Sequence, residues 1–253
     1  MRIARFSHEG EVAFAVLEDD TLAEIAAHPF GPITFTGRRV PLADVRLLAP
    51  VLPSKVVAIG RNYAEHASEM GGDVPEQPLI FLKPSTAVVG AGDSIGYPPS
   101  SQRVDYEGEL AVVIGRLCRD VPESRAAEVV FGYTCGNDVT ARDQQRADGQ
   151  WSRAKGYDTF CPLGPWIETD LDVSDLRVTT TLNGAVKQDG RTAQIVHKIP
   201  SLIAHITACM TLLPGDVILT GTPAGVGPMQ VGDEVGVEVE GIGRLVNRVV
   251  ARG

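Results

Sequence analysis

The sequence has little of what marks membrane, secreted or nucleic-acid-binding proteins. Its 253 residues contain no apolar stretch as long as a transmembrane helix, and residues 1–6 lack the apolar run of a signal peptide. Acidic residues outnumber basic ones, and the resulting net charge of −9 disfavours nucleic acid as a partner. We therefore expect a cytoplasmic protein that binds neither a membrane nor nucleic acid.

Cysteine is scarce as well. The four cysteines form no CxxC pair and have no zinc-site spacing: Cys118, Cys135, Cys161 and Cys209. We expect them to be reduced, small and buried. The glycine-rich loop 219–227 lacks the Gly-Lys-Ser/Thr ending of a P-loop, so phosphate binding is not expected there.

What remains is an ordinary globular composition, with 43% hydrophobic and 22% charged residues. The length suffices for a sizeable core. Two prolines within residues 48–53 disfavour both helix and central strand, which indicates a linker. We predict a small N-terminal domain over residues 1–50 and a catalytic domain over residues 51–253.

Short strand-like segments dominate the chain. The predicted strands cover residues 2–6, 11–17, 55–60, 78–82, 107–114, 178–182, 217–220, 234–239 and 243–250. Helical patterns are fewer, at residues 63–70, 124–130 and 199–211, and residues 90–99 read mostly as turns. Many strands with few helices predict a β-rich α+β fold with a folded-over sheet.

Two acidic residues stand at the mouth of an apolar strand. On one strand Glu107 and Glu109 point to the same face, with Cα atoms about 6.6 Å apart. Acids before a strand are often only solvated surface, but here the apolar run 110–114 indicates a buried strand. Carboxylates in such a place repel unless a proton or a cation lies between them.

A third carboxylate, Asp138, follows another apolar run, where a strand is expected to end. With Glu107 and Glu109 it gives an all-oxygen ligand set, which favours Mg²⁺, Mn²⁺ or Ca²⁺ over zinc or copper. Such a site keeps ligand positions open for substrate. It also carries net negative charge, so an anionic substrate needs Arg142 or Lys155 nearby, although single residues of this kind are more often solvated surface groups.

Two further features suggest chemistry. His66 and Glu69 lie three residues apart on a predicted helix, so the glutamate can orient the histidine as a general base, unless the pair is incidental surface. Gly71 and Gly72 follow, so we ask whether residues 61–77 form a mobile lid. In the loop 219–227, a tight turn is expected to bring Thr222 close to a ligand.

Taken together, these motifs resemble the fumarylacetoacetate hydrolase family over roughly residues 50–250. The matching segments are Gly60-Arg61-Asn62-Tyr63 with His66 and Glu69, Phe81-Leu82-Lys83-Pro84, Asp105-Tyr106-Glu107 with Glu109, Asp138 with Thr140-Ala141-Arg142-Asp143, Lys155, and Thr220-Gly221-Thr222-Pro223 with Gly225-Val226-Gly227. The first 50 residues resemble the small, variable N-terminal domain of many bacterial members.

The resemblance implies a mixed β-roll fold and a homodimer that acts on small β-diketo or α-keto acids. It implies Mg²⁺ or Mn²⁺ at Glu107, Glu109 and Asp138. The water-activating pair falls on His66 and Glu69. The positions that contact substrate fall on Arg142, Gln145, Thr222 and Lys155, of which we count Lys155 among the catalytic groups.

Several reactions of this family share one metal-stabilised enolate, so the sequence separates them poorly. Because the His66–Glu69 pair is intact, we rank acylpyruvate hydrolysis first, ahead of oxaloacetate decarboxylation. Isomerisation of 2-hydroxyhepta-2,4-diene-1,7-dioate comes third. An alternative from another class is a non-catalytic keto-acid-binding protein, for which loss of the His–Glu pair or of Lys155 would be the sign.

Overall fold

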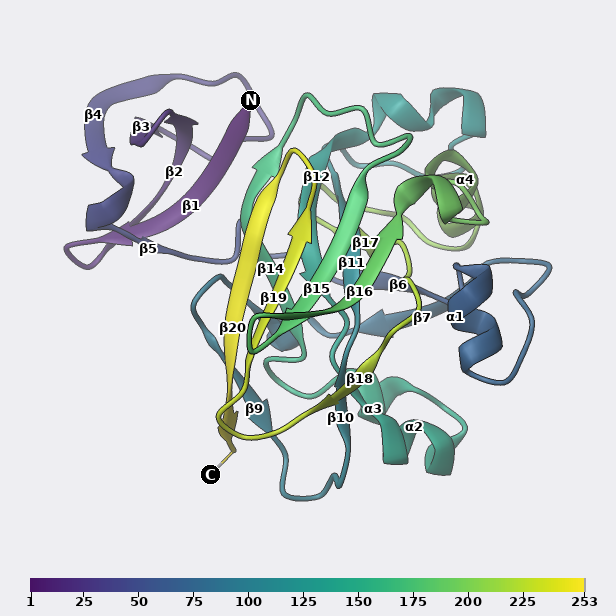
Figure 1. Ribbon diagram of the computed structural model, residues 1–253. Helices are drawn as coiled ribbons and strands as arrows, with labels where there is room; N and C mark the ends of the chain where they lie inside the picture. Colours follow the sequence, from purple (N-terminus) through teal and green to yellow (C-terminus); the bar gives the residue numbers. More distant parts are fainter. Residues whose placement is uncertain (253) are drawn as a thin grey trace.

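The computed structural model describes residues 1–252, and β-strands dominate it (Figure 1). The largest sheet has twelve strands. In spatial order these are β4 (Phe35–Pro41), β3 (Thr21–Ile25), β2 (Glu11–Glu18), β1 (Arg2–His8), β14 (Cys161–Glu168), β12 (Val130–Asn137), β11 (Gly108–Ile114), β17 (Val217–Leu219), β6 (Val56–Gly60) and β7 (Leu79–Lys83), with β5 (Arg46–Leu47) beside β1 and β8 (Val88–Val89) beside β14.

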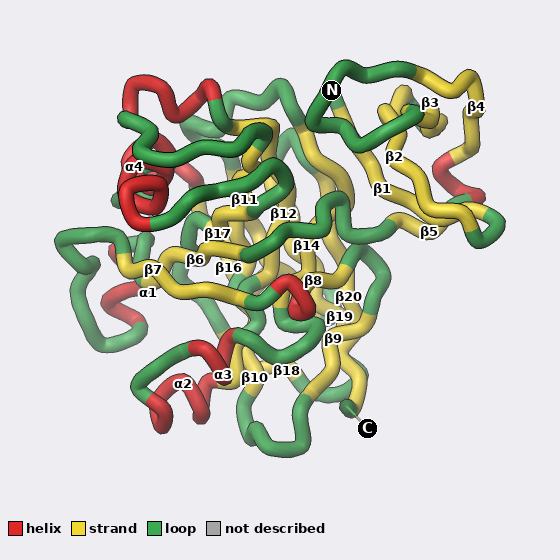
Figure 2. Tube along the Cα trace, turned by 180° about the vertical axis from the view of Figure 1, so that it is seen from behind, coloured by secondary structure: helices red, strands yellow, loops and turns green. Residues whose placement is uncertain are grey.

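Two smaller sheets and a few short helices complete the fold. One sheet contains β13 (Thr140–Ala141), β10 (Val104–Tyr106) and β18 (Gly227–Met229); the other contains β16 (Ala185–Arg191), β15 (Arg177–Leu182), β19 (Glu234–Val239), β20 (Gly243–Ala251) and β9 (Ser94–Tyr97). The helices are α1 (Ala64–Glu69), α2 (Arg142–Asp148), α3 (Ser152–Lys155) and α4 (Ile199–Cys209), with 3-10 turns η1 (Leu42–Asp44), η2 (Ser85–Ala87), η3 (Glu123–Glu128) and η4 (Thr192–Gln194). Figure 2 shows α2 and α3 beside β10 and β18.

Both faces of the central strands β6, β11 and β17 are buried, which explains the nearly continuous apolar runs of these strands. In β6, Val56 and Ala58 pack into one core cluster, while Val57 and Ile59 pack into another against α4. Alternation of this kind follows from the period of two along a strand. Each fully buried aliphatic side chain contributes about 1.5–3 kcal/mol, so this double core anchors the strand ends that carry the site.

The N-terminal strands have a small core of their own and join the main sheet at one edge. Their cluster includes Phe6, Leu17 and Leu22, and β1 pairs with β14 only through Arg2 and Ile3. In Figure 1 these strands lie to one side of the other sheets. The division into domains at residue 50 stays a prediction.

The β-rich α+β class is confirmed, and several predicted elements are found where expected. The turn Asn183-Gly184 joins β15 to β16, and both of its residues have positive φ, as such hairpin turns require. No helix formed by residues 1–252 is long and apolar enough to cross a membrane.

Four local expectations were wrong. Glu107 does not lie on the strand with Glu109, because the chain passes there from the small sheet of β10 to the large sheet of β11. Residues 90–99 contain the strand β9, which pairs in parallel with β20. The predicted helix at residues 124–130 is only the 3-10 turn η3, and Cys209, unlike the three buried cysteines, is exposed at the end of α4.

Candidate metal centre and active site

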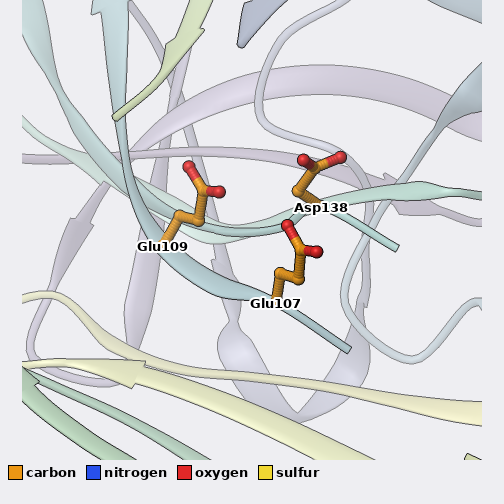
Figure 3. Close-up of side chains that lie close together, drawn as sticks. All are labelled: Glu107, Glu109 and Asp138. Atoms are coloured by element: carbon orange, nitrogen blue, oxygen red, sulfur yellow. The ribbon is translucent and has the colours of Figure 1, made fainter. Parts of the chain in front are cut away.

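Three carboxylates converge where β10, β11 and β12 meet. Glu107 lies between β10 and β11, Glu109 is the second residue of β11, and Asp138 directly follows β12. The amide of Asp138 donates a hydrogen bond to the carbonyl of Glu107 (2.8 Å), which fixes the two segments side by side. One carboxylate oxygen from each residue lies within 4.8 Å of the others, and Figure 3 shows the three side chains close together.

Two glycines make this convergence possible. A Cβ on Gly108 would collide with Oγ1 of Thr180, so the crossing between the two sheets packs directly on β15. Gly221 has φ +103°, and a Cβ there would lie 2.7 Å from Cβ of Asn62. This close approach lets the amide of Gly221 donate a hydrogen bond to Oε2 of Glu109 (2.7 Å).

Buried cations hold two of the three carboxylates. The Nζ atom of Lys155 lies 2.8 Å from Oε2 of Glu107 and 2.5 Å from Oδ2 of Asp138. A second buried lysine, Lys83, donates to Oδ1 of Asp138 (2.6 Å). Arg142 donates to Oε1 of Glu107 (2.5 Å), so both oxygens of Glu107 and both of Asp138 have a cationic partner.

Glu109 is different, since no Lys, Arg or His nitrogen of residues 1–252 lies within 4 Å of its carboxylate. Burial, together with the charges of Asp138 and Glu107, raises the pKa of Glu109 well above its usual value. Burial also opposes ionisation of Glu107, but there Lys155 and Arg142 prevail and lower the pKa. The ionised form of Glu109 thus lacks a cationic partner among the described residues, and a divalent cation among the three oxygens would supply one.

The residues therefore fit a hard divalent ion. The set offers only oxygen ligands, and all three side chains are buried. Glu109, whose charge no Lys, Arg or His of the described chain balances, lies beside the other two. Carboxylate oxygens at this spacing suit Mg²⁺ or Mn²⁺ better than zinc, which prefers nitrogen and sulfur.

His66 and Glu69 lie on α1, at the rim of the same pocket. Nδ1 of His66 is 3.3 Å from Oε2 of Glu69, as the spacing along the helix predicted. The His66 side chain is buried, whereas Glu69 is about one third exposed and also accepts a hydrogen bond from the amide of Gly225 (3.2 Å). A base oriented in this way has its second ring nitrogen free to face a ligand.

All of the predicted site residues line one cavity of about 270 Å³. They are His66, Glu69, Glu107, Glu109, Asp138, Arg142, Gln145, Lys155 and Thr222. The structure thus brings the predicted set together, while the roles assigned to its members stay predictions.

Three predicted substrate contacts already have partners within the protein. Arg142 donates to Gln145 (2.6 Å) and, through Nε, to Asp105 (2.9 Å). The hydroxyl of Thr222 donates to the carbonyl of Gly108 (2.8 Å) and accepts a hydrogen bond from Gln188 (2.7 Å). These bonds set the position and orientation that each group can offer to a ligand.

Sequence reasoning missed several residues of the site. Lys83 was noted only within a motif, although a lysine that ends an apolar strand and is fully buried must have a carboxylate partner. Asp105 was likewise noted only within a motif, and it links Arg142 to Arg103. The aromatic wall of the pocket gave no local signal, since Phe81 and Trp151 meet edge to face (5.3 Å) from distant segments.

Comparison with known proteins decides the family. Residues 55–250 match the model of the fumarylacetoacetate (FAA) hydrolase C-terminal domain, and residues 1–50 match the Rv2993c-like N-terminal model. The chain belongs to the fumarylacetoacetate hydrolase family. Protein Rv2993c of Mycobacterium tuberculosis is 57% identical over 100% of this chain and 99% of its own length. The human mitochondrial oxaloacetate tautomerase FAHD2A is 41% identical over 98% of this chain and 79% of its own length.

Solved structures of family members agree with the fold. The 5-carboxymethyl-2-hydroxymuconate delta-isomerase of Mycobacterium smegmatis is 58% identical, covers both chains fully and superposes with a TM-score of 0.95. The maleylpyruvate hydrolase of Sphingobium sp. SYK-6, solved in complex with manganese(II) and pyruvate, is 35% identical with a TM-score of 0.83 and covers both chains fully. Members of this family are therefore enzymes with tautomerase, isomerase or hydrolase activity, and one of them was solved with a divalent metal ion.

Proposed function

We propose that this protein is a divalent-metal-dependent enzyme that cleaves a carbon–carbon bond of a small acylpyruvate by hydrolysis. The observation that carries this proposal is the His66–Glu69 pair, 3.3 Å apart, in the same cavity as the acidic triad. A hydrolase of this kind needs a base for water beside an electrophilic centre. The named maleylpyruvate hydrolase of the family, with its manganese ion and pyruvate, supports the same reaction class.

Glu107, Glu109 and Asp138 would hold Mg²⁺ or Mn²⁺. The ion, when bound, supplies a Lewis acid that polarises a keto oxygen and stabilises enolate charge. Lys155 and Arg142 are positioned by their carboxylate partners to offer positive charge to the anionic substrate. His66, oriented by Glu69, accepts the proton of the attacking water and returns it to the departing carbon.

A second candidate is enolate chemistry without water, in which the substrate is isomerised, tautomerised or decarboxylated. The human relative named as an oxaloacetate tautomerase and the mycobacterial relatives named as isomerases favour it. In that case the site only moves a proton or releases carbon dioxide. A non-catalytic keto-acid-binding protein is the remaining alternative, and the complete set of His66, Glu69 and Lys155 in the pocket argues against it.

The partner proposed here is therefore a small anionic keto acid. A homodimer and a cytoplasmic location are also proposals, which sedimentation velocity and fractionation of the source cells would test. The net charge of −9 supports the absence of nucleic-acid binding, and titration with a labelled duplex would check it.

The deciding experiment is a substrate panel with Mg²⁺ and with Mn²⁺. Acetylpyruvate, oxaloacetate and a diene-diacid are each mixed with the protein, and loss of the enol absorbance and the products are followed. Hydrolysis of an acylpyruvate to pyruvate and a carboxylic acid supports the first proposal. Turnover of oxaloacetate or the diene-diacid alone supports the second candidate, and no turnover of any substrate favours the binding protein.

A further inference from the structure

A buried glutamine on an otherwise exposed strand contacts the backbone of the metal centre. β16 is an edge strand of the five-stranded sheet, and Gln188 is only 1% exposed, although the residues on both sides of it are exposed. The register of β15 and β16 shifts by one residue at this point, which leaves Lys187 as an extra residue. Irregularities of this kind re-aim a side chain, and a buried side-chain amide needs hydrogen-bond partners.

The side-chain amide of Gln188 uses both its acceptor and its donors. Oε1 accepts a hydrogen bond from the amide of Gly108 (2.9 Å). Nε2 donates to Oγ1 of Thr222 (2.7 Å) and to the carbonyl of Pro223 (2.8 Å). These partners fix the orientation of the side chain, because only Oε1 can accept from an N–H group and only Nε2 can donate to a carbonyl. Gln188 thus joins two segments that are 114 residues apart in the sequence.

Gln188, Thr222 and Gly108 form a closed ring of hydrogen bonds. The hydroxyl of Thr222 accepts from Nε2 of the glutamine and donates to the carbonyl of Gly108 (2.8 Å). The ring therefore holds the peptide groups on both sides of Gly108, and these are the two that connect Glu107 to Glu109. Because a glycine backbone has more conformational freedom than any other, the separation of the two glutamates depends on such a restraint.

The loop held by this ring also bonds a metal ligand and the His–Glu pair. The amide of Gly221 donates to Oε2 of Glu109 (2.7 Å), and the amide of Gly225 donates to Glu69 (3.2 Å). A Cβ on Gly225 would collide with the carbonyl oxygen of Lys187, so the loop lies directly on the backbone of β16. A displacement of the loop relative to β16 would therefore reach both parts of the site.

We propose that Gln188 is a positioning residue of the metal centre. Through the ring with Thr222 it sets the separation of the two glutamates on either side of Gly108, and thereby the affinity for the divalent ion. Gln188 does not itself line the active-site cavity, so it acts through its neighbours and not by contact with the substrate. This inference rests on the proposed function, since that function requires the metal.

The test measures Mn²⁺ binding by calorimetry and the stability of the metal-free protein by urea unfolding. Gln188→Met keeps the length of the side chain and removes all three hydrogen bonds. We expect the Kd for Mn²⁺ to rise about tenfold to hundredfold, the usual cost of removing an outer-shell partner of metal ligands. Gln188→Asn stays polar but is one methylene too short to close the ring, and it should show the same loss, so the test does not depend on one variant.

Asn247→Leu is the matched control. Asn247 lies on β20 of the same sheet, is as buried as Gln188 (2% exposed) and does not line the active-site cavity. Its Nδ2 donates to the carbonyls of Gly90 (2.8 Å) and Asp93 (2.9 Å). The control should lower the free energy of unfolding as Gln188→Met does, but leave the Kd for Mn²⁺ within about twofold of wild type.

A double-mutant cycle shows whether the ring carries the effect. Thr222→Val removes the hydroxyl between Gln188 and Gly108. Combined with Gln188→Met, it should raise the Kd for Mn²⁺ by much less than the product of the two single effects, because either variant alone opens the same ring. Combined with Asn247→Leu, it should give the product, as independent sites do.

The outcomes separate this inference from the proposed function. Wild-type affinity for Mn²⁺ in the Gln188 variants would overturn the inference and leave the proposed function intact. An equal loss of affinity in Asn247→Leu would overturn it as well, because general destabilisation would then account for the effect. Independent effects of Gln188→Met and Thr222→Val would exclude the ring as the route. Failure of the wild type to bind Mn²⁺ would overturn the proposed function and this inference with it.

Discussion

Nζ of Lys155 lies 2.5 Å from Oδ2 of Asp138, so a buried lysine is paired with one of the three carboxylates that would hold a metal ion. The same nitrogen also reaches Glu107. Burial opposes the charge of Lys155, but Asp138 and Glu107 prevail and raise its pKa. The protein thus keeps an internal cation that partly stands in for the metal, and the two cations repel each other when both are present.

Substitution of Lys155 should accordingly lower the stability of the metal-free protein but increase the stabilisation that metal binding provides. Lys155→Met removes the partner of two buried carboxylates, which we expect to destabilise the metal-free protein by about 3–5 kcal/mol. Mn²⁺ should then raise the melting temperature of the variant more than that of the wild type, because the repulsion is gone. Differential scanning fluorimetry with and without Mn²⁺ measures both effects, and Lys187→Met, on the exposed face of β16, is the control. Equal melting temperatures of variant and wild type in both conditions would contradict this account.

Glu109→Gln should have the reverse effect on stability: no loss in the metal-free protein, and a smaller gain when metal is added. Its carboxylate has no cationic partner and a raised pKa, so a neutral amide that keeps the hydrogen bond from Gly221 relieves repulsion. We expect the metal-free variant to be at least as stable as the wild type. At a metal concentration of one hundred times Kd the wild type gains about 2.7 kcal/mol, and the variant should lose most of this gain along with activity.

The same melting experiment and calorimetric titration with Mn²⁺ test this expectation. Glu128→Gln, on the exposed turn η3, serves as the control. Undiminished metal affinity in Glu109→Gln would show that the triad does not hold the ion.

Removal of the His66–Glu69 pair should separate hydrolysis from proton transfer without water. His66→Asn and Glu69→Gln remove the proposed base and its orienting group, so kcat for acylpyruvate hydrolysis should fall about 10²–10⁴-fold and about tenfold or more, respectively. Oxaloacetate decarboxylation, which needs no attacking water, should fall much less. Steady-state kinetics on both substrates measure the ratio. A parallel loss of both activities would assign the pair a role in binding or structure, and Glu65→Gln on the same helix is the control.

Asp216 should govern acid stability outside the active site. Its buried carboxylate accepts hydrogen bonds from the amides of Ser54, Lys55 and Leu213, from the hydroxyl of Ser54 and from Nζ of Lys55 (2.5 Å). Burial opposes ionisation, yet these bonds lower the pKa of Asp216 below its ordinary value. The stabilisation is therefore complete above about pH 4, the ordinary pKa of an aspartate, and is lost as the pH falls toward the lowered value.

Asp216→Asn should remove this pH-dependent stabilisation. The side-chain amide cannot accept all of the hydrogen bonds that the carboxylate accepts, and it leaves Lys55 without an ionic partner. We expect a loss of about 3 kcal/mol at neutral pH, and a smaller difference from wild type at acid pH. Urea unfolding at pH 7 and pH 3.5 measures both. A difference that grows with acidity would show the opposite sign of linkage and refute the assignment.

The fold was predictable where local chemistry suffices. β6 follows from a β-branched run, β15 and β16 from the Asn183-Gly184 turn, and α1 from its spacing and the glycines after it. β9 was missed because its four residues lie among turn formers, and only pairing with β20, far away in sequence, makes them a strand. The break at Glu107 was missed because a choice between two sheets leaves no local mark.

In the site, too, residues whose roles depend on distant partners could not be predicted from the sequence. The acids and the His66–Glu69 pair have residue types whose chemistry can be read without coordinates. Lys83 could not be assigned in this way, because its partner Asp138 is 55 residues further along the chain. Arg61 and Arg146 also needed the structure, since only their place in the cavity lining distinguishes them from ordinary surface arginines.

The bond from the amide of Gly221 to Glu109 has a consequence for how the protein is made. The two residues are 112 positions apart, and β17, which ends just before Gly221, is also the neighbour of β11 in the sheet. During synthesis, all three carboxylates are made by residue 138, but the strand and the amide that support Glu109 follow only when nearly nine tenths of the polypeptide has been translated. Shorter nascent chains lack both the β17 neighbour of β11 and the hydrogen bond from Gly221, so Glu109 takes its final position late in synthesis.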